Sequence, residues 1–425
     1  MNSQHGLTGV RILDFTWSVA GPTMTRYLAG MGAEVIKVEW PTQGDPMRTA
    51  MYRSDTQDKT ADNGAFFANL NVGKRSLTIN VRDPKGLDVV KDLVRLCDVV
   101  TESFSAGVLE RWGLGWDVLR ELNPDIIYAS ISGFGHTGRH RTKSTWGPTA
   151  QAMSGITASA GEAGEEPSGW GWSYLDVAAG YFGAIGVLNA LRQRQLGKGG
   201  SRVDMSQVEV GLALAGPALT EHLTTGRPFP TTYPPGNRSI DGSGRAVGYR
   251  GDAAPVSDLF RTAEGDANGF VAITIAESEL ARAAAWLGGV DVSPDSVRLA
   301  LINWAASRDK YQAADELAAA GFVGAPLQSG KDRVEKDPHL TARRFLRTMS
   351  HPLLGAHDLQ DLPFRVHDGE SWEFGDEWPL LGAHNEQILG ELLGYSRQQI
   401  EELRDGHVLW PEGLPTEIKI GASLW

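Results

Sequence analysis

The sequence of 425 residues contains a single cysteine, Cys97, and has no basic tail. One thiol excludes an intrachain disulfide and a multi-cysteine zinc site, and it fits a reducing compartment. Acidic residues outnumber basic ones by 52 to 40, which gives a formal net charge of -12. Because nucleic-acid binding needs a basic surface, general nucleic-acid binding is excluded.

Sequence motifs for common cofactors and nucleophiles are also missing. The chain has no GxxxxGK[ST] phosphate loop, no GxSxG nucleophile turn, no HExxH zinc motif and no GxGxxG dinucleotide turn. His136 and His140 lie close together, but their surroundings, GFGHTGRHRTK, are typical of a solvated loop rather than a metal site. We therefore expect no bound metal and no tightly bound cofactor.

Membrane and export signals are equally scarce. The N-terminus, MNSQHGLTGVRILDF, has no basic segment followed by a long apolar one, so no signal peptide is predicted. The most apolar stretch, Val177–Leu188, is shorter than the roughly 20 residues that cross a bilayer. We expect a cytoplasmic protein without membrane contact.

Short apolar stretches that alternate with helical patterns predict a parallel sheet covered by helices. Asp83-Pro84 is typical of a helix start, because aspartate caps a first turn and proline suits the first helical position. The pattern indicates an α/β fold with a Rossmann-like large domain, 1–225, completed by 340–425. Residues 226–339 are expected to form a linker and a small α+β domain. Strands of the large domain are expected at 10–15, 33–38, 76–81, 99–101 and 126–131.

Four motifs follow one another in a fixed order. They are GLTGVRILDFTWSVAGPTMTRYLAGMGAEVIKVEWPTQGDPMR at 6–48, NLNVGKRSLTINVRDPKG at 69–86, SFSAGVLERWGL at 103–114 with LNPDIIYASISGFG at 122–135, and YLDVAAGYFGAIGVLNALRQRQLGKGGSRVDMS at 174–206. In this order and spacing the chain closely resembles the class III CoA-transferase family, which includes formyl-CoA transferase, carnitine CoA-transferase and the 2-methylacyl-CoA racemases. The resemblance is strong over the first half of the chain and weaker over the C-terminal third.

The resemblance implies an enzyme that moves CoA from an acyl-CoA donor, such as succinyl-CoA, to a carboxylic acid. Asp176 stands at the position of the family's nucleophile, which forms an aspartyl anhydride and then an aspartyl-CoA thioester. The residue type by itself favours another interpretation, since an aspartate that opens a helix is usually an N-cap. Both interpretations hold if one carboxylate oxygen stays free and faces a cleft.

The resemblance also implies residues that contact coenzyme A. Arg82 and Arg111 would face the nucleotide, while Phe104 and Trp112 would pack on adenine or pantetheine. Two positions depart from the family: Trp40 replaces an arginine, and Ser144 replaces a loop lysine. The other implied contacts are Ser18, Val19, Ala20, Arg48, Ile79 and Lys143, which neighbours Ser144.

A lid over the site is expected in the Gly-rich segment 235–251, whose backbone N–H groups could stabilise tetrahedral oxygens. The family's run of consecutive glycines is absent there. Tryptophans near the motifs suit core packing, or an acyl pocket for an aromatic or bulky acid.

Two alternatives stay open. One is a 2-methylacyl-CoA racemase or epimerase, which pairs the aspartate with a histidine; Trp146 stands at that position and disfavours it. The other is a CoA-binding subunit of a heteromeric transferase, against which Asp176 argues. The resemblance further implies an interlocked homodimer.

Overall fold

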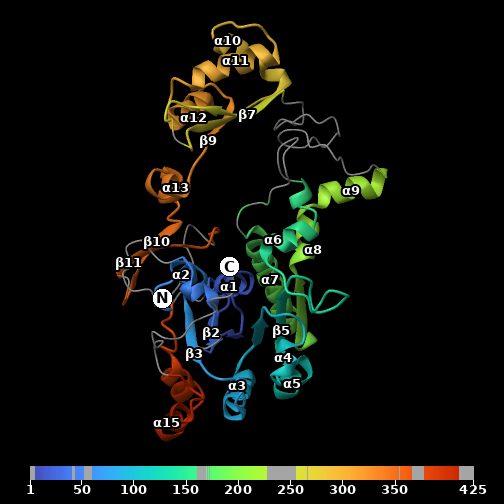
Figure 1. Ribbon diagram of the computed structural model, residues 1–425, viewed down its shortest axis with the longest axis vertical. Coiled ribbons are helices and arrows are strands. Elements are labelled where there is room, and N and C mark those ends of the chain that lie inside the picture. The colour runs from blue at the N-terminus through green and yellow to red at the C-terminus, as the bar shows by residue number, and fades with distance from the viewer. Residues whose placement is uncertain are drawn as a thin grey trace. The chain divides into compact units, whose positions relative to one another are not determined.

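The structure is a computed structural model in which two compact units are formed (Figure 1). The larger comprises Met1–Ala158, Gly169–Gly216 and Arg344–Trp425, and the smaller comprises Ser159–Ser168 and Pro217–Arg343. The lid segment predicted at 235–251 lies outside the described residues. Described are residues 5–40, 44–51, 60–159, 169, 171, 173–226, 255–265, 267–353, 355–365 and 378–410.

The larger unit is built on a six-stranded parallel sheet with the order β3-β2-β1-β4-β5-β6. This is the strand order of a doubly wound Rossmann-type sheet, so the predicted α/β fold is confirmed. The chain reverses its winding direction between β1 and β4. The strands are β1 (Arg11–Asp14), β2 (Glu34–Glu39), β3 (Lys74–Thr78), β4 (Val99–Glu102), β5 (Ile127–Ser132) and β6 (Ser201–Ser206).

Strand β3 begins at Lys74, two residues before the predicted start. Lys74 is a poor sequence signal for a buried strand, yet its side chain is buried against Asp14 of β1. This ion pair forms only after the strands align. The start of β3 could therefore not be predicted from the sequence.

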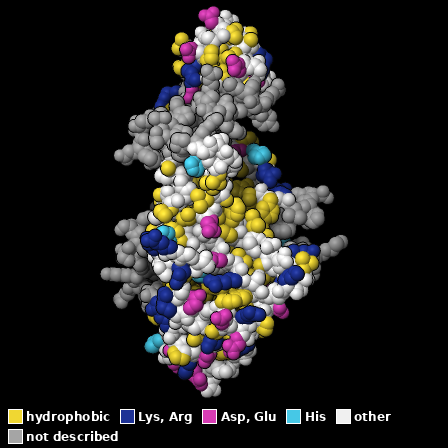
Figure 2. All heavy atoms as spheres, turned by 90° about the vertical axis from the view of Figure 1, so that its right-hand side faces the viewer, with side chains coloured by type: hydrophobic (Ala, Val, Ile, Leu, Met, Phe, Trp, Pro, Cys, Tyr) yellow, Lys and Arg dark blue, Asp and Glu magenta, His cyan; other side chains and the backbone are white. Residues whose placement is uncertain are grey.

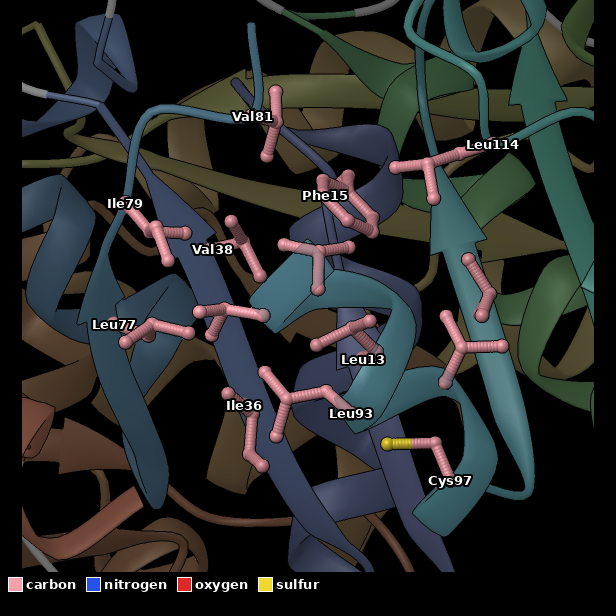
Figure 3. Close-up of a cluster of buried hydrophobic side chains, with 14 of the residues drawn as sticks. Leu13, Phe15, Ile36, Val38, Leu77, Ile79, Val81, Leu93, Cys97 and Leu114 are labelled. Atoms are coloured by element: carbon pink, nitrogen blue, oxygen red, sulfur yellow. The ribbon is translucent and has the colours of Figure 1, made fainter. Parts of the chain in front are cut away.

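Neighbouring side chains of β1 enter hydrophobic clusters on opposite faces of the sheet, as the pleat of a strand requires. In β1, Leu13 packs with α3 (Pro84–Leu96) and the C-terminal helix α15 (Arg397–Asp405), in the cluster drawn in Figure 3. Ile12 packs on the other face, with α1 (Ala20–Gly30) and α7 (Tyr174–Gln193). Helix α3 begins at Pro84 with Asp83 as its cap, as predicted.

Helix α7 approaches α1 closely through two glycines. A Cβ atom at Gly180 would lie 2.6 Å from Thr23 Cβ, and one at Gly183 would lie 2.9 Å from Met24 Sδ, so larger side chains do not fit. The segment Tyr174–Lys198 is long and apolar enough to span a membrane by length and composition alone, and half of an apolar 18-residue stretch within it is buried inside the protein. The short apolar stretch predicted at Val177–Leu188 is thus part of a longer helix with one side in the core.

The C-terminal segment completes the larger unit. Asn385 Oδ1 accepts a hydrogen bond from Thr78 N at 2.9 Å, and Leu409 pairs with Ile79 just after β3. The remaining elements of this unit are the 3-10 turns Pro46–Thr49 and Thr157–Ser159, α2 (Ala65–Asn71), α4 (Val108–Arg111), α5 (Trp116–Leu122), α6 (Gly147–Met153), α8 (Gln207–Leu214), the hairpin β10 (Leu346–His351) and β11 (Gly355–Gln360), and the π turns Arg194–Lys198 and Gln387–Leu392.

The smaller unit has an antiparallel sheet of order β7-β8-β9. Alternate residues of β8 (Phe270–Ile275) are buried against helices, so this unit has its own hydrophobic core. Its other elements are α9 (Gly216–Thr225), β7 (Val256–Arg261), the 3-10 turn Glu277–Glu279, α10 (Leu280–Trp286), α11 (Pro294–Ala305), α12 (Lys310–Ala319), β9 (Val323–Pro326), α13 (Gly330–Glu335) and α14 (Pro338–Ala342).

Candidate active site

A cavity of about 440 Å³ lies at the carboxyl edge of the parallel sheet. Ligands of doubly wound proteins bind at this edge, where the winding direction reverses between β1 and β4. The wall comes from residues 17–20 after β1, 103–105 after β4, 131–133 at the end of β5, 143–146 and Pro148 at the start of α6, Ser173 and Asp176 of α7, Gln207 of α8, and Met47.

Asp176 is the acidic residue of this wall. Helix α7 begins at Tyr174 with Ser173 as its N-cap residue, so Asp176 lies in the first turn and the expected N-cap role is wrong. The exposed fraction of Asp176 is 9%, so the residue is almost fully buried. An ionised carboxylate at a helix start is favoured by the helix dipole, while burial opposes the charge.

The carboxylate of Asp176 accepts three hydrogen bonds. Gln207 Nε2 donates to Oδ1 at 2.5 Å, and the Ser173 hydroxyl and the Gly147 N–H also donate to the carboxylate. Burial raises the pKa of Asp176 above its ordinary value, and the three donors offset only part of this effect. Three donors occupy three of the about four acceptor positions of a carboxylate, so one position remains for attack on a substrate.

Gly147 provides the space in which the carboxylate lies. A Cβ atom at this position would be 2.5 Å from Asp176 Oδ2. Any side chain larger than hydrogen would displace the carboxylate or the start of α6. Gly147, Ser173 and Gln207 were not predicted from the sequence; for Gln207, its position directly after strand β6 was the available signal.

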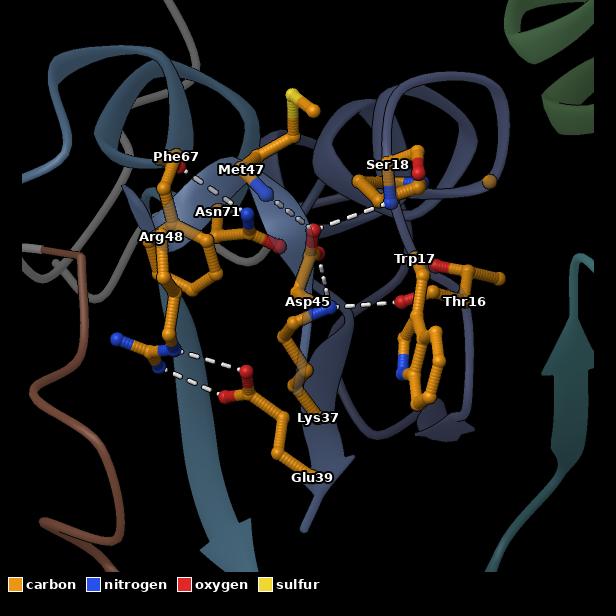
Figure 4. A network of polar contacts seen from close by, with 12 residues as sticks. Thr16, Trp17, Ser18, Lys37, Glu39, Asp45, Met47, Arg48, Phe67 and Asn71 are labelled. Atoms are coloured by element: carbon orange, nitrogen blue, oxygen red, sulfur yellow. Dashed lines mark hydrogen bonds and ion pairs between the residues drawn. The ribbon is translucent and has the colours of Figure 1, made fainter. Parts of the chain in front are cut away.

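The turn between β1 and α1 is stabilised by a buried ion pair between Lys37 and Asp45 (Figure 4). Lys37 Nζ lies 3.0 Å from Asp45 Oδ2 and donates to the Thr16 carbonyl oxygen at 2.7 Å. Asp45 Oδ1 accepts from the N–H groups of Ser18, at 3.1 Å, and Met47, at 3.0 Å. Ser18 has a positive φ of 63°, which a serine rarely adopts, so these contacts fix the cavity wall in an otherwise unfavourable conformation.

Arg48 was predicted to contact coenzyme A, but the structure places it in the core. Its guanidinium donates to both carboxylate oxygens of Glu39, at 2.8 and 2.7 Å, and to Asp62 at 3.0 Å. The guanidinium also stacks on the Phe67 ring at 3.8 Å (Figure 4). A cation that is fully buried and paired in this way is not available to a phosphate.

Two aromatic residues expected at the coenzyme site lie next to each other. Phe104 lines the cavity, and its ring meets Trp112 edge-on with centroids 5.3 Å apart. Trp112 lies behind Phe104 and packs against the hydrophobic core.

The structure brings six of the predicted site residues together in the cavity wall and leaves others outside it. Ile79 is fully buried in the core, whereas Arg82 and Arg111 are exposed outside the wall. The six in the wall are Ser18, Val19, Ala20, Phe104, Lys143 and Asp176.

His136 is buried rather than part of a solvated loop, so that prediction is wrong. Its Nε2 lies 3.1 Å from Glu102 Oε1, and its backbone N–H donates to Asp204. Burial by itself lowers the pKa of His136, but the hydrogen bond and charge of Glu102 reverse this and raise it. Glu102 Oε2 in turn accepts from Phe104 N at 2.6 Å, so the cluster positions the cavity wall. Among the described residues, no group of three or more metal-ligating side chains occurs.

Comparisons with known proteins agree with these features. The chain matches the sequence profile of CoA-transferase family III over residues 7–385. It is 32% identical over 429 residues to the formyl-CoA:oxalate CoA-transferase of Rhodopseudomonas palustris strain HaA2, with 95% of this chain and 97% of the relative covered. It is 34% identical over 423 residues to the succinyl-CoA--D-citramalate CoA-transferase of Chloroflexus aurantiacus, covering 95% and 98%.

Solved structures show the same fold. A CaiB/BaiF family protein from Brucella suis superposes with a TM-score of 0.77 at 24% identity, covering 92% of this chain and 100% of that one. Rv3272 from Mycobacterium tuberculosis has a TM-score of 0.71 at 25% identity, covering 90% and 99%. The predicted resemblance is confirmed: the chain belongs to CoA-transferase family III, and it is an enzyme whose substrates are CoA thioesters.

Proposed function

We propose that the protein transfers CoA from an acyl-CoA donor, such as succinyl-CoA, to a carboxylic acid, with Asp176 as the covalent nucleophile. The observation that carries this proposal is a buried carboxylate in the cavity wall, held by three hydrogen-bond donors at the start of a helix. A carboxylate in this position has the charge and the fixed orientation that attack on a thioester needs.

The proposed reaction has four steps, and no redox partner is involved. Asp176 attacks the thioester carbon, the C–S bond breaks, and an acyl-aspartyl anhydride and CoA thiolate form. The thiolate attacks the aspartyl carbon, and the donor acid leaves as a carboxylate. The acceptor carboxylate then attacks the aspartyl-CoA thioester and releases the thiolate, which takes the acceptor acyl group and restores Asp176.

Basic residues at one side of the cavity suit the phosphates of CoA. Lys143 lines the cavity, and the carbonyl oxygen of Arg141 accepts a hydrogen bond from Ala106 N at 3.2 Å. The Arg111 guanidinium lies beside the neighbouring Gly107, where an added Cβ atom would be 3.3 Å from Arg111 Nη1. We infer that Lys143, Arg141 and Arg111, all exposed, provide the cations that an otherwise acidic protein needs for this ligand.

The cavity wall near Asp176 supports a bulky or aromatic acid as acceptor. Trp17, Phe104, Ile131, Trp146 and Met47 contribute apolar surface. Trp17 and Phe104 meet edge-on with centroids 5.1 Å apart, and Trp146 is 48% exposed. Such a wall favours an apolar substituent, because a small dianion such as oxalate gains nothing from it.

An exposed apolar surface on the larger unit supports the proposed homodimer. Tyr181, Phe182 and Ile185 of α7 are exposed, Ile185 to 60%. Hydrophobic side chains gather on one face of the molecule in Figure 2. Apolar surface of this kind usually marks a protein interface, and we propose a second copy of this chain as the occupant.

The test of the catalytic proposal is a screen of carboxylic acids with succinyl-CoA and acetyl-CoA, in which new CoA thioesters are measured by mass spectrometry. Asp176→Ala should abolish transfer and keep CoA binding, because the nucleophile is lost while the basic residues remain. Hydroxylamine should convert Asp176 of the unmodified enzyme to a hydroxamate during turnover. The control is Glu121→Ala, which removes an exposed carboxylate on α5 and should leave transfer unchanged.

The same preparation separates the alternatives. Transfer by Asp176→Ala at the unmodified rate would overturn the proposal. Exchange of the α-hydrogen of a 2-methylacyl-CoA with deuterated water would indicate a racemase instead. CoA binding without either reaction would indicate a subunit that needs a different partner chain.

A further inference from the structure

Gln207 contacts Asp176 from a separate element of the fold. It is the first residue of α8, which follows β6 directly and is capped by Ser206, whose Oγ accepts from Glu209 N at 3.3 Å. Gln207 is buried and lines the cavity, and its Nε2 lies 2.5 Å from Asp176 Oδ1. The strand and the cap together fix where this side chain begins.

The amide of Gln207 can take only one orientation toward an ionised carboxylate. A carboxylate accepts hydrogen bonds and donates none, so the amide must present its NH2 group to Oδ1 and not its oxygen. The contact therefore holds one oxygen of Asp176 and leaves the other distinguishable from it. Oδ2 lies instead beside Gly147, in the space that a Cβ atom would fill.

We propose that Gln207 fixes Oδ1 as the oxygen that becomes the aspartyl carbonyl oxygen, so that Oδ2 attacks the donor thioester and later leaves with the donor acid. When the CoA thiolate adds to the aspartyl carbon, the electron pair moves onto Oδ1, where the Gln207 N–H stabilises it. When the tetrahedral centre collapses, the bond from the aspartyl carbon to Oδ2 breaks. This inference rests on the proposed function and assigns different roles to the two oxygens of its nucleophile.

A neutral donor suits this role better than a cation. Asp176 must be ionised to attack, yet a close positive charge would hold the carboxylate too strongly and reduce its nucleophilicity. The other charged side chain in the described wall of the cavity is Lys143. Burial raises the pKa of Asp176, and the hydrogen bond from Gln207 lowers it, so loss of Gln207 raises the pKa further.

The first experiment uses the unmodified enzyme. Succinyl-CoA is incubated for many turnovers with succinate carrying heavy oxygen in its carboxylates, and the peptide that contains Asp176 is weighed by mass spectrometry. Each turnover replaces the oxygen that bonds to the acyl group. With Oδ1 fixed by Gln207, Asp176 should gain one heavy oxygen and no second one. Two heavy oxygens in Asp176 would overturn the inference, because the carboxylate would then rotate freely between turnovers.

The second experiment removes the donor with little change in side-chain length. Gln207→Met should lower kcat about 100-fold, the usual effect of losing one donor to a developing oxyanion. The KM for acyl-CoA should stay the same, the acid limb of the pH profile should move to higher pH, and Asp176 should gain two heavy oxygens. The control Gln398→Met alters an exposed glutamine on α15 and should change none of these values. A kcat within twofold of the unmodified enzyme with an unmoved acid limb would overturn the inference.

Gln207→Glu provides a matched variant of nearly identical shape. Two carboxylates at this separation share a proton and do not both ionise, so activity should fall as the pH rises through neutrality, opposite to the unmodified enzyme. A profile of the usual direction would overturn the inference. If Asp176 of the unmodified enzyme gains no heavy oxygen and no hydroxamate while transfer proceeds, the proposed function itself fails, which is a separate result.

Discussion

The buried surroundings of Asp176 disfavour the ionised form of its carboxylate. Burial raises its pKa, while Ser173, Gln207 and the Gly147 N–H lower it without cancelling the effect. In the pH window between the unfolded and the folded pKa, the native state holds more protons than the unfolded state. Stability therefore falls as the pH rises through this window and stays reduced above it.

Asp176→Asn should consequently stabilise the protein at neutral pH while abolishing transfer. A neutral amide removes the buried charge, and relief of such an active-site compromise usually contributes about 0.5–2 kcal/mol. Urea unfolding of both proteins at pH 7 measures the difference, which should disappear once the pH is below both pKa values. A variant that is less stable than the unmodified protein at pH 7 would contradict this account.

Residue type and motif position together indicated Asp176, but they failed at Arg48 and Gln207. An arginine within a matching motif is equally compatible with a phosphate contact and a buried ion pair. Only the positions of Glu39 and Asp62 decide for the ion pair. Gln207 carries no motif of its own, and its contact with Asp176 arises because β6 ends at the cavity where α7 begins.

At the scale of elements, buried charges link strands that apolar residues alone would not distinguish. Lys37 of β2 forms an ion pair with Asp45 next to the cavity wall, and Lys74 of β3 forms an ion pair with Asp14 of β1 at 3.2 Å. Burial by itself lowers the pKa of Lys37, but Asp45, Glu39 and Asp14 reverse the effect and raise it. Burial lowers the pKa of Lys74 to about 8, with Asp14 opposing. The turn between β1 and α1 therefore depends on pairs that form only in the native sheet.

Lys37→Met should destabilise the protein by about 3–5 kcal/mol, because Asp45 is left as an uncompensated buried charge. The free energy of unfolding in urea measures this loss. Removal of both partners, in Lys37→Met with Asp45→Asn, should restore part of it. Lys331→Met is the control, since Lys331 is exposed and its nitrogen lies 3.9 Å from Glu335, a pair that contributes little. Equal losses in the Lys37 and Lys331 variants would contradict the role of burial.

For the whole molecule, the apolar surface on α7 belongs to a helix whose other side packs in the core. Light scattering of the purified chain should give the mass of two copies. Ile185→Glu places a charge on this surface and should reduce the dimeric fraction, whereas Leu353→Glu, at another exposed leucine, should not. A monomeric unmodified chain that transfers CoA would contradict the proposed homodimer.

The parallel α/β class, the helix start at Asp83-Pro84 and the family could all be predicted from the amino-acid sequence, because alternation of apolar segments, capping chemistry and motif order are local properties. The tertiary structure decided which polar residues lie at the cavity and which lie in the core. That choice depends on where strands end and which charges meet across the sheet. For this reason Arg48, which was expected to contact coenzyme A, forms an ion pair in the core, and Gln207, which was not predicted, contacts Asp176.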